Sequence, residues 1–160
     1  MTITKRFLFV ILTLVFTTLV FSQTFSPASW EHSVEKISDT HYRINLTVNL
    51  QEGYSIYSQY KIVEDGLAPQ TFFDFKNQKG NYKLIGKTTE PDVKIKYDAI
   101  FEENVKKFQK QAVFTQIISL LNPDFNLIEI AAEYQTCDDE KCILGDDIFK
   151  FNLDGTTVKE

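Results

Sequence analysis

The amino-acid sequence predicts an all-β fold, an antiparallel β-sandwich built from a single domain. After residue 23, hydrophobic residues recur mostly at every second position, which is typical of strands with one buried face. Clusters of Gly, Pro, Asn and Asp separate these runs at short intervals. About eight short strands at this spacing favour a sandwich of the immunoglobulin-like type.

The clearest strand is "YRINLTVNL" (42–50), in which the hydrophobic residues from Ile44 to Leu50 fall on one face. The sequence "QEG" then turns the chain into the next run. Further strands are expected at 54–60, 71–75, 82–86, 92–97, 111–119, 127–134 and 147–153. Residues 102–112 are the one stretch where a helical turn competes, because Val105, Phe108 and Ala112 have helical spacing.

Residues 1–22 have the pattern of a secretory signal peptide. Lys5 and Arg6 precede an uncharged apolar run (7–21), and the small residue Ser22 follows it. The run is shorter than the ~20 residues that a membrane-spanning helix needs, so an uncleaved anchor is the less favoured alternative. We therefore expect residues 23–160 to be one exported domain.

The charge pattern argues against nucleic acids and acidic lipids as partners. The whole chain has a net charge of −5, and the expected leader contains two of its cations, so the exported part is more acidic still. No basic cluster remains in that part, which argues against a nucleic-acid partner. We expect a monomer with no cofactor.

The segment "YQTCDDEKCIL" (134–144) contains both cysteines of the chain, Cys137 and Cys142. They flank a four-residue loop between two predicted strands. Facing residues in an antiparallel pair have Cα atoms ~4.5–5.5 Å apart, and a disulfide requires ~4.4–6.8 Å. The geometry permits a disulfide, and an exported chain meets an oxidising compartment.

Three roles are open for this pair: a structural staple, half of a metal site, or a reversible disulfide. Closing a loop of about six residues stabilises a fold by only ~2 kcal/mol in the chain-entropy estimate. Because the hairpin turn already closes this loop, we favour the reversible disulfide. A metal site is disfavoured, since His32 and His41 are distant and the Cys-x4-Cys spacing is wider than the usual zinc spacing.

Five landmarks in a fixed order resemble the N-terminal periplasmic domain of the thiol:disulfide interchange protein DsbD. They cover nearly all of residues 28–153 and are Trp30, "GYSIYSQY" (53–60), "PQTFFDF" (69–75), "YDAIFEENVKKF" (97–108) and "YQTCDDEKC" (134–142). The resemblance implies an immunoglobulin-like periplasmic domain whose cysteine pair relays electrons. Its implied partners are a membrane-embedded reductase system and thioredoxin-like proteins. An exported binding module with a purely structural disulfide is the alternative.

The resemblance also assigns site residues. Cys142 matches the cysteine that partners attack, and Cys137 matches its more buried companion. Phe101 matches the aromatic residue of a cap loop that shields the pair, and Tyr57 matches a tyrosine that lines the site. Asp98 and Ile100 lie in the same cap segment and join the expected site.

The chain departs from the family pattern at several of these positions. Four residues separate the cysteines where the best-known members have five, and "ILG" (143–145) stands where a Pro-Pro pair is common. Glu102 replaces the second cap-loop aromatic, and Ser55 replaces a site tyrosine.

The residues around the pair predict a disulfide that is attacked rather than a thiol that attacks. Three acidic residues lie between the cysteines and disfavour a thiolate, and Lys141 offsets only part of that charge. Exchange would then be driven by a partner's thiolate. Cys137 is expected to be the better buried sulfur because it follows a strand whose alternating residues, from Ile128 to Tyr134, face the core.

Overall fold

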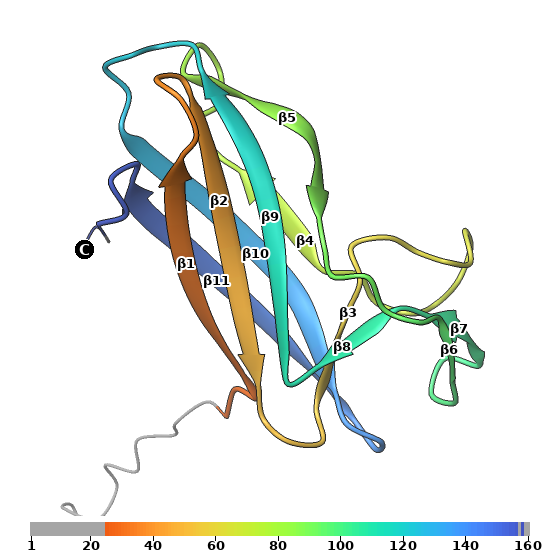
Figure 1. The fold of residues 1–160 in the computed structure, drawn as a ribbon. Helices are drawn as coiled ribbons and strands as arrows, with labels where there is room; N and C mark the ends of the chain where they lie inside the picture. The colour runs from red at the N-terminus through yellow and green to blue at the C-terminus, as the bar shows by residue number, and fades with distance from the viewer. Residues whose placement is uncertain (1–24, 157, 159–160) are drawn as a thin grey trace, which may run out of the picture.

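The structure is a computed structural model that describes residues 25–156 and 158. The expected signal peptide and the domain boundary at residue 23 lie outside the described residues. The described chain folds into the following strands (Figure 1): β1 Ala28–Lys36, β2 His41–Leu50, β3 Ser55–Tyr57, β4 Phe72–Phe75, β5 Tyr82–Thr89, β6 Lys96–Asp98, β7 Glu103–Val105, β8 Lys107–Gln109, β9 Gln111–Leu120, β10 Leu127–Cys137 and β11 Cys142–Asn152.

Two antiparallel sheets pack face to face, which confirms the predicted immunoglobulin-like β-sandwich. The four-stranded sheet has the order β1-β2-β9-β5, and the five-stranded sheet has the order β11-β10-β3-β8 with β4 also paired to β10. Strands β6 and β7 form a separate hairpin beside this second sheet (Figure 1). Among the described residues there is no helix long and apolar enough to cross a membrane.

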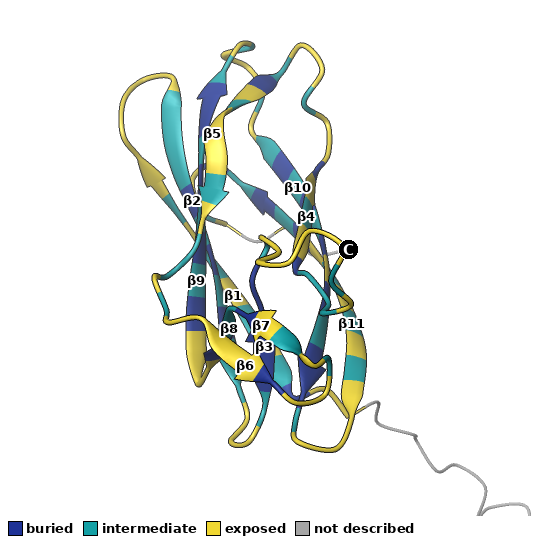
Figure 2. Cartoon of the chain, turned by 90° about the vertical axis from the view of Figure 1, so that its right-hand side faces the viewer, coloured by how far each residue is buried: buried dark blue, intermediate teal, exposed yellow. Residues whose placement is uncertain are grey.

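The main core lies between the two sheets and follows from the alternation of hydrophobic residues along the long strands. In β2, the residues Ile44, Leu46 and Val48 are all buried, as the sequence predicted. Trp30 of β1 packs against Phe73, Phe114, Tyr134 and Phe149 with ring centroids 5.3–6.0 Å apart. Figure 2 shows buried residues recurring along β2, β9 and β10.

Strand β1 was not among the predicted strands. Its sequence, "ASWEHSVEK", alternates between half-buried and exposed residues over its first eight positions. Only Trp30 and Val34 on its inner face are strongly hydrophobic, so the period of two is weak in the sequence. Two predicted strands are shorter than expected (Ser55–Tyr57 and Lys96–Asp98), and the last one begins earlier, at Cys142.

The helical alternative for residues 102–112 is wrong, because β7, β8 and the start of β9 occupy this stretch. Glu102 and Lys110 have positive φ angles of 56° and 66°, which end any regular segment at those positions. Val105 and Phe108 also pack into two different apolar clusters, whereas one helical face would have placed them together.

Candidate functional site: a disulfide covered by a hairpin

The two cysteines form a disulfide at the end of the β10–β11 ladder. Cys137 is the last residue of β10 and Cys142 the first of β11, and they face each other with Cα atoms 4.1 Å apart. The N–H of Asp138 donates to the carbonyl of Lys141 at 3.0 Å and closes the loop. The Asp138 carboxylate accepts the N–H groups of Glu140 and Lys141, each at 2.9 Å, and these bonds lower its pKa.

The two cysteine residues differ in exposure. Cys137 is 3% exposed, as expected, and Cys142 belongs to the exposed residues. The reason expected for this burial, that Cys137 follows a strand whose alternating residues face the core, was wrong. Ile128 to Tyr134 face the main core at even-numbered positions, and the unbroken register places Cys137 on the opposite, outer face of the five-stranded sheet. A second set of residues must therefore bury it.

That second set is a small apolar cluster on the outer face, here called the cap cluster. It consists of Tyr57, Val105 and Cys137, with Ala68 and Phe101 packed against them. The rings of Tyr57 and Phe101 meet edge to face, with centroids 5.6 Å apart. These residues come from β3, β7, β10, one loop and one turn, so no single strand pattern predicts them.

Residues 96–105, here called the cap hairpin, contribute Phe101 and Val105 to this cluster. They comprise β6, a turn and β7 (Figure 1). Within the turn, Phe101 is half-buried and Ile100 is 43% exposed. Glu102 has the positive φ of a tight turn and is exposed, so it does not contribute to the cap cluster.

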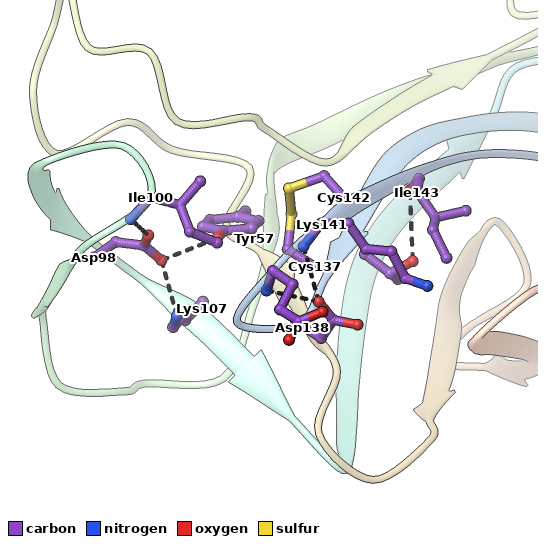
Figure 3. The surroundings of a disulfide bond; sticks show 11 residues. Tyr57, Asp98, Ile100, Lys107, Cys137, Asp138, Lys141, Cys142 and Ile143 are labelled. Atoms are coloured by element: carbon purple, nitrogen blue, oxygen red, sulfur yellow. Dashed lines mark hydrogen bonds and ion pairs between the residues drawn. A yellow bond between two sulfur atoms is a disulfide. The ribbon is translucent and has the colours of Figure 1, made fainter.

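One buried carboxylate joins the cap hairpin to the sandwich. Asp98 is 2% exposed, and its Oδ2 accepts the hydroxyl of Tyr57 at 2.9 Å and Lys107 Nζ at 2.8 Å. Its Oδ1 accepts the N–H of Ile100 at 3.0 Å. Figure 3 shows these three bonds converging on Asp98 beside the disulfide. The cap hairpin is thus fixed to β3 and β8 through Asp98.

The electrostatics of this network favour an ionised Asp98. Burial alone would raise its pKa, but the hydrogen bonds from Lys107, Tyr57 and the Ile100 N–H hold the pKa below its ordinary value of 3.8. Burial, together with the bond to Asp98, raises the pKa of Tyr57. The ammonium group of Lys107 compensates this buried negative charge from 2.8 Å away, and its own side chain is only 26% exposed.

A second carboxylate ties the cap hairpin to the long loop after β3. Glu103 of β7 accepts the N–H of Ala68 at 2.5 Å. Ala68 itself packs against the cap cluster, so this bond positions one wall of the site. Ser55, which stands where the family has a site tyrosine, is buried in β3 directly opposite Cys137.

Gly145 belongs to the "ILG" segment (143–145), which stands where a Pro-Pro pair is common in the family. It faces Tyr134 across the ladder, and a Cβ at this position would lie 2.4 Å from the Tyr134 ring. The Tyr134 hydroxyl donates to Asp147 at 2.7 Å; burial, and then this bond, raise the pKa of Tyr134 to about 12. A side chain at position 145 would therefore displace a core tyrosine next to the site.

A family model for "Thiol:disulfide interchange protein DsbD, N-terminal" matches residues 23–153. The chain belongs to the DsbD N-terminal domain family. The expected resemblance is therefore confirmed, and the disulfide-bonded cysteines at positions 137 and 142 lie within the matched residues. None of the curated proteins matches the chain.

Two solved structures share the fold. The N-terminal periplasmic domain of ScsB from Proteus mirabilis is 21% identical, with a TM-score of 0.58 over 83% of this chain and 49% of that one. The present chain thus spans about half the length of the ScsB structure. A structure of the complex between the DsbD N-terminal and PilB N-terminal domains from Neisseria meningitidis is 12% identical, with a TM-score of 0.51 over 86% of this chain and 93% of that one.

The structure brings the expected site residues together but adds others. Cys137, Tyr57 and Phe101 share the cap cluster, and Asp98 and Ile100 are joined by a hydrogen bond. Sequence reasoning missed Lys107, Val105, Ala68 and Glu103. Lys107 is one of several lysines between 94 and 110, and nothing in the sequence distinguishes it. Among the described residues, no three His, Cys, Asp or Glu side chains are arranged to hold a metal ion.

Proposed function

We propose that this domain relays electrons by thiol–disulfide exchange at Cys137–Cys142. Its partners are thioredoxin-like proteins, which connect it on one side to a membrane-embedded reductase system and on the other to oxidised acceptors. The proposed compartment is the periplasm, where the ScsB domain is found. The chain would reach it through the expected signal peptide.

The observation that carries the proposal is the asymmetry of the disulfide. Cys142 is exposed at the start of β11, while Cys137 is buried under the cap hairpin. In this proposal an incoming thiolate attacks the exposed Cys142, and the buried Cys137 is the sulfur that leaves. A staple has no need of one accessible sulfur, and this one closes a loop too short to stabilise the fold by more than about 2 kcal/mol.

The proposed exchange proceeds in two steps. A partner thiolate attacks Sγ of Cys142, so an intermolecular S–S bond forms while the Cys137–Cys142 bond breaks. The electron pair leaves on the sulfur of Cys137, which then takes up a proton. The second cysteine of the same partner then attacks the partner sulfur of the mixed disulfide. Cys142 is released as a thiolate and takes up a proton. The partner is now oxidised, and this domain holds two thiols that it can pass to an acceptor by the reverse steps.

The charges near the pair suit this division of roles. The loop between the cysteines contains three acidic residues, Asp138, Asp139 and Glu140. Their negative charge disfavours a thiolate on this domain. The exposed Lys141 directly precedes Cys142 and would help to attract an incoming thiolate. The reactive anion is therefore expected to come from the partner.

The test compares two single-cysteine variants. Cys137→Ser leaves an exposed thiol that should form a stable mixed disulfide with a thioredoxin whose resolving cysteine is replaced by serine and whose remaining cysteine is activated. Cys142→Ser should trap much less, because its remaining thiol is buried. Non-reducing gels measure both yields.

Equal trapping by the two variants would refute the assignment of Cys142 as the attacked sulfur. Trapping by neither, together with a reduction potential below about −300 mV, would support the structural disulfide instead. Alkylation in cells supplies a further measurement: the relay predicts a mixture of reduced and oxidised protein.

A further inference from the structure

Strand β11 forms one edge of the five-stranded sheet, and the two halves of that edge differ. Its far half is covered by the chain's own C-terminal segment. The N–H of Val158 donates to the carbonyl of Lys150 at 3.0 Å, and the N–H of Asn152 donates to the carbonyl of Thr156 at 2.8 Å. In Figure 1 this segment turns back beside the arrowhead of β11. Its near half, which starts at Cys142, has no strand beside it among the residues that the structure describes.

The bonds at the far end show which residues face the edge. Lys150 stands opposite Glu129, and its carbonyl points outward to Val158. The carbonyl of Glu129 points the other way and accepts the N–H of Lys76 at 2.8 Å. Lys150 and Glu129 are therefore a pair without mutual hydrogen bonds. The register is unbroken back to Cys137 and Cys142, whose Cα separation of 4.1 Å fits the same kind of pair.

By this alternation, the backbone groups of Leu144, Asp146 and Ile148 point to the open edge. Each residue presents one N–H and one carbonyl, and none of these groups has a backbone partner in the described part of the chain. Open edges invite pairing with another chain, and proteins usually cover them. Here the cover reaches only as far as Lys150, so the edge from Cys142 to Ile148 stays open.

The geometry of a mixed disulfide brings a second chain to this edge. Two residues joined by a disulfide have Cα atoms ~4.4–6.8 Å apart, and neighbouring strands lie ~4.7–4.9 Å apart. A protein bonded to Cys142 therefore has some of its backbone at strand-pairing distance from β11. Binding by strand addition uses such backbone groups for affinity and adjacent side chains for specificity.

The side chains beside the edge define the chemistry of the second chain. Leu144 and Ile148 are 79% and 64% exposed on the same outer face as Cys142. On the other side of β10, Phe72 of β4 is 62% exposed, and with Leu144 it lines a shallow depression of about 350 Å³ across the outer face of β10. Asp146 and the loop acids add negative charge. The complementary segment is extended, apolar on one face and flanked by basic residues.

We propose that the open half of β11, Cys142–Ile148, pairs as a β-strand with an extended segment of the protein that exchanges with Cys142. This inference rests on the proposed exchange function and adds the surface that orients the partner. It places recognition on backbone groups, so one domain can accept several partners that share little sequence around the reactive cysteine.

The first experiment measures amide hydrogen exchange in the mixed disulfide of Cys137→Ser with a thioredoxin that lacks its resolving cysteine. The amides of Leu144, Asp146 and Ile148 should exchange at least tenfold more slowly than in the free variant. The amides of β1, the edge strand of the other sheet, serve as a control and should not change. If the mixed disulfide forms and the three amides exchange as before, the strand-pairing proposal is wrong while the exchange function stands. Protection that rises with concentration in the free protein would assign the edge to a second copy and also overturn the proposal.

A matched pair of variants tests the same surface by rate. Asp146→Ala keeps the outward N–H, and Asp146→Pro removes it without removing a bond to β10. The ratio of the reduction rate by thioredoxin to that by glutathione should be about tenfold lower for the proline variant, as expected for one lost hydrogen bond plus local misfit. Equal ratios in two folded variants would contradict the proposal, and if Asp146→Pro does not fold, the exchange experiment decides.

Discussion

The main core and the cap cluster are both apolar, but they are built in different ways. The main core gathers residues from the long strands of both sheets and lies between them. The cap cluster has three buried members and two half-buried ones, drawn from two short strands, the last residue of β10, a loop and a turn. An ion pair between the buried Asp98 and the partly exposed Lys107 accompanies it, as does the disulfide.

This difference separates stability from reactivity. A large core of interlocking side chains loses several kcal/mol when one is truncated, because the cavity cannot close. A small cluster on the outer face can open without exposing that core, and elements that move during function are drawn from such weakly held regions. We therefore expect substitutions in the main core to lower stability, and substitutions around the cap cluster to change access to the disulfide.

The largest effect is expected from Phe114→Ala in the main core. Phe114 is 1% exposed in β9 and packs against Trp30, Phe73 and Phe108. Its truncation should lower the free energy of unfolding by about 3–5 kcal/mol. Urea denaturation measures this loss. The rate at which glutathione reduces the disulfide, measured without denaturant, should remain near that of the wild type. A large increase in this rate would show that the two clusters open together.

An intermediate effect is expected from Lys107→Met, which leaves the buried Asp98 without its cation. We expect a loss of about 2 kcal/mol, less than the 3–5 kcal/mol typical of a fully buried pair because Lys107 remains partly exposed. The cap hairpin should also loosen, so glutathione should reduce the disulfide faster. Lys106→Met is the matched control. Lys106 makes a 3.9 Å pair with a fully exposed Asp92, and such surface pairs contribute little.

The pH dependence of the Lys107→Met effect gives a further check. The folded-state pKa of Asp98 lies below its ordinary value of 3.8, so the network stabilises the fold above that pH and loses its effect as the pH falls through the folded-state pKa. Without Lys107, Asp98 takes up its proton at a higher pH than in the wild type, so the stability difference between wild type and Lys107→Met should be largest at neutral pH and should shrink as the pH falls. A difference that stays constant down to pH 2 would mean that the pair contributes only through packing.

The sequence predicted the main core far better than the site. Alternation located the long strands because each buries one whole face, and it placed Ile44, Leu46 and Val48 correctly. It failed for Cys137, which lies on the other face of β10 and depends on the cap hairpin for burial. The helical alternative for the stretch with Val105 arose for the same reason: its neighbours in the fold come from distant segments. Lys107 carries no local signal, because only the fold brings it to Asp98.

The smallest stability effect is expected from Phe101→Ala, yet it should change reactivity the most. Phe101 lies in the turn of the cap hairpin, is half-buried, and makes one edge-to-face contact with Tyr57. Its truncation should lower the free energy of unfolding by about 1 kcal/mol, well below the 3–5 kcal/mol typical of a fully buried Phe, because the ring is only half-buried in a turn. Glutathione should reduce the disulfide markedly faster, because the ring no longer covers the cap cluster.

Phe125→Ala is the control for this last variant, because it removes a similar ring at the opposite end of β10. Phe125 is also half-buried and stacks on Tyr82, with ring centroids 5.8 Å apart. It should lose comparable stability and leave the reduction rate unchanged. If Phe101→Ala instead lowered the stability by several kcal/mol, Phe101 would belong to a structural core. If the reduction rates of both variants matched the wild type, the ring would not shield the disulfide, and the burial of Cys137 would depend on Tyr57 and Val105 alone.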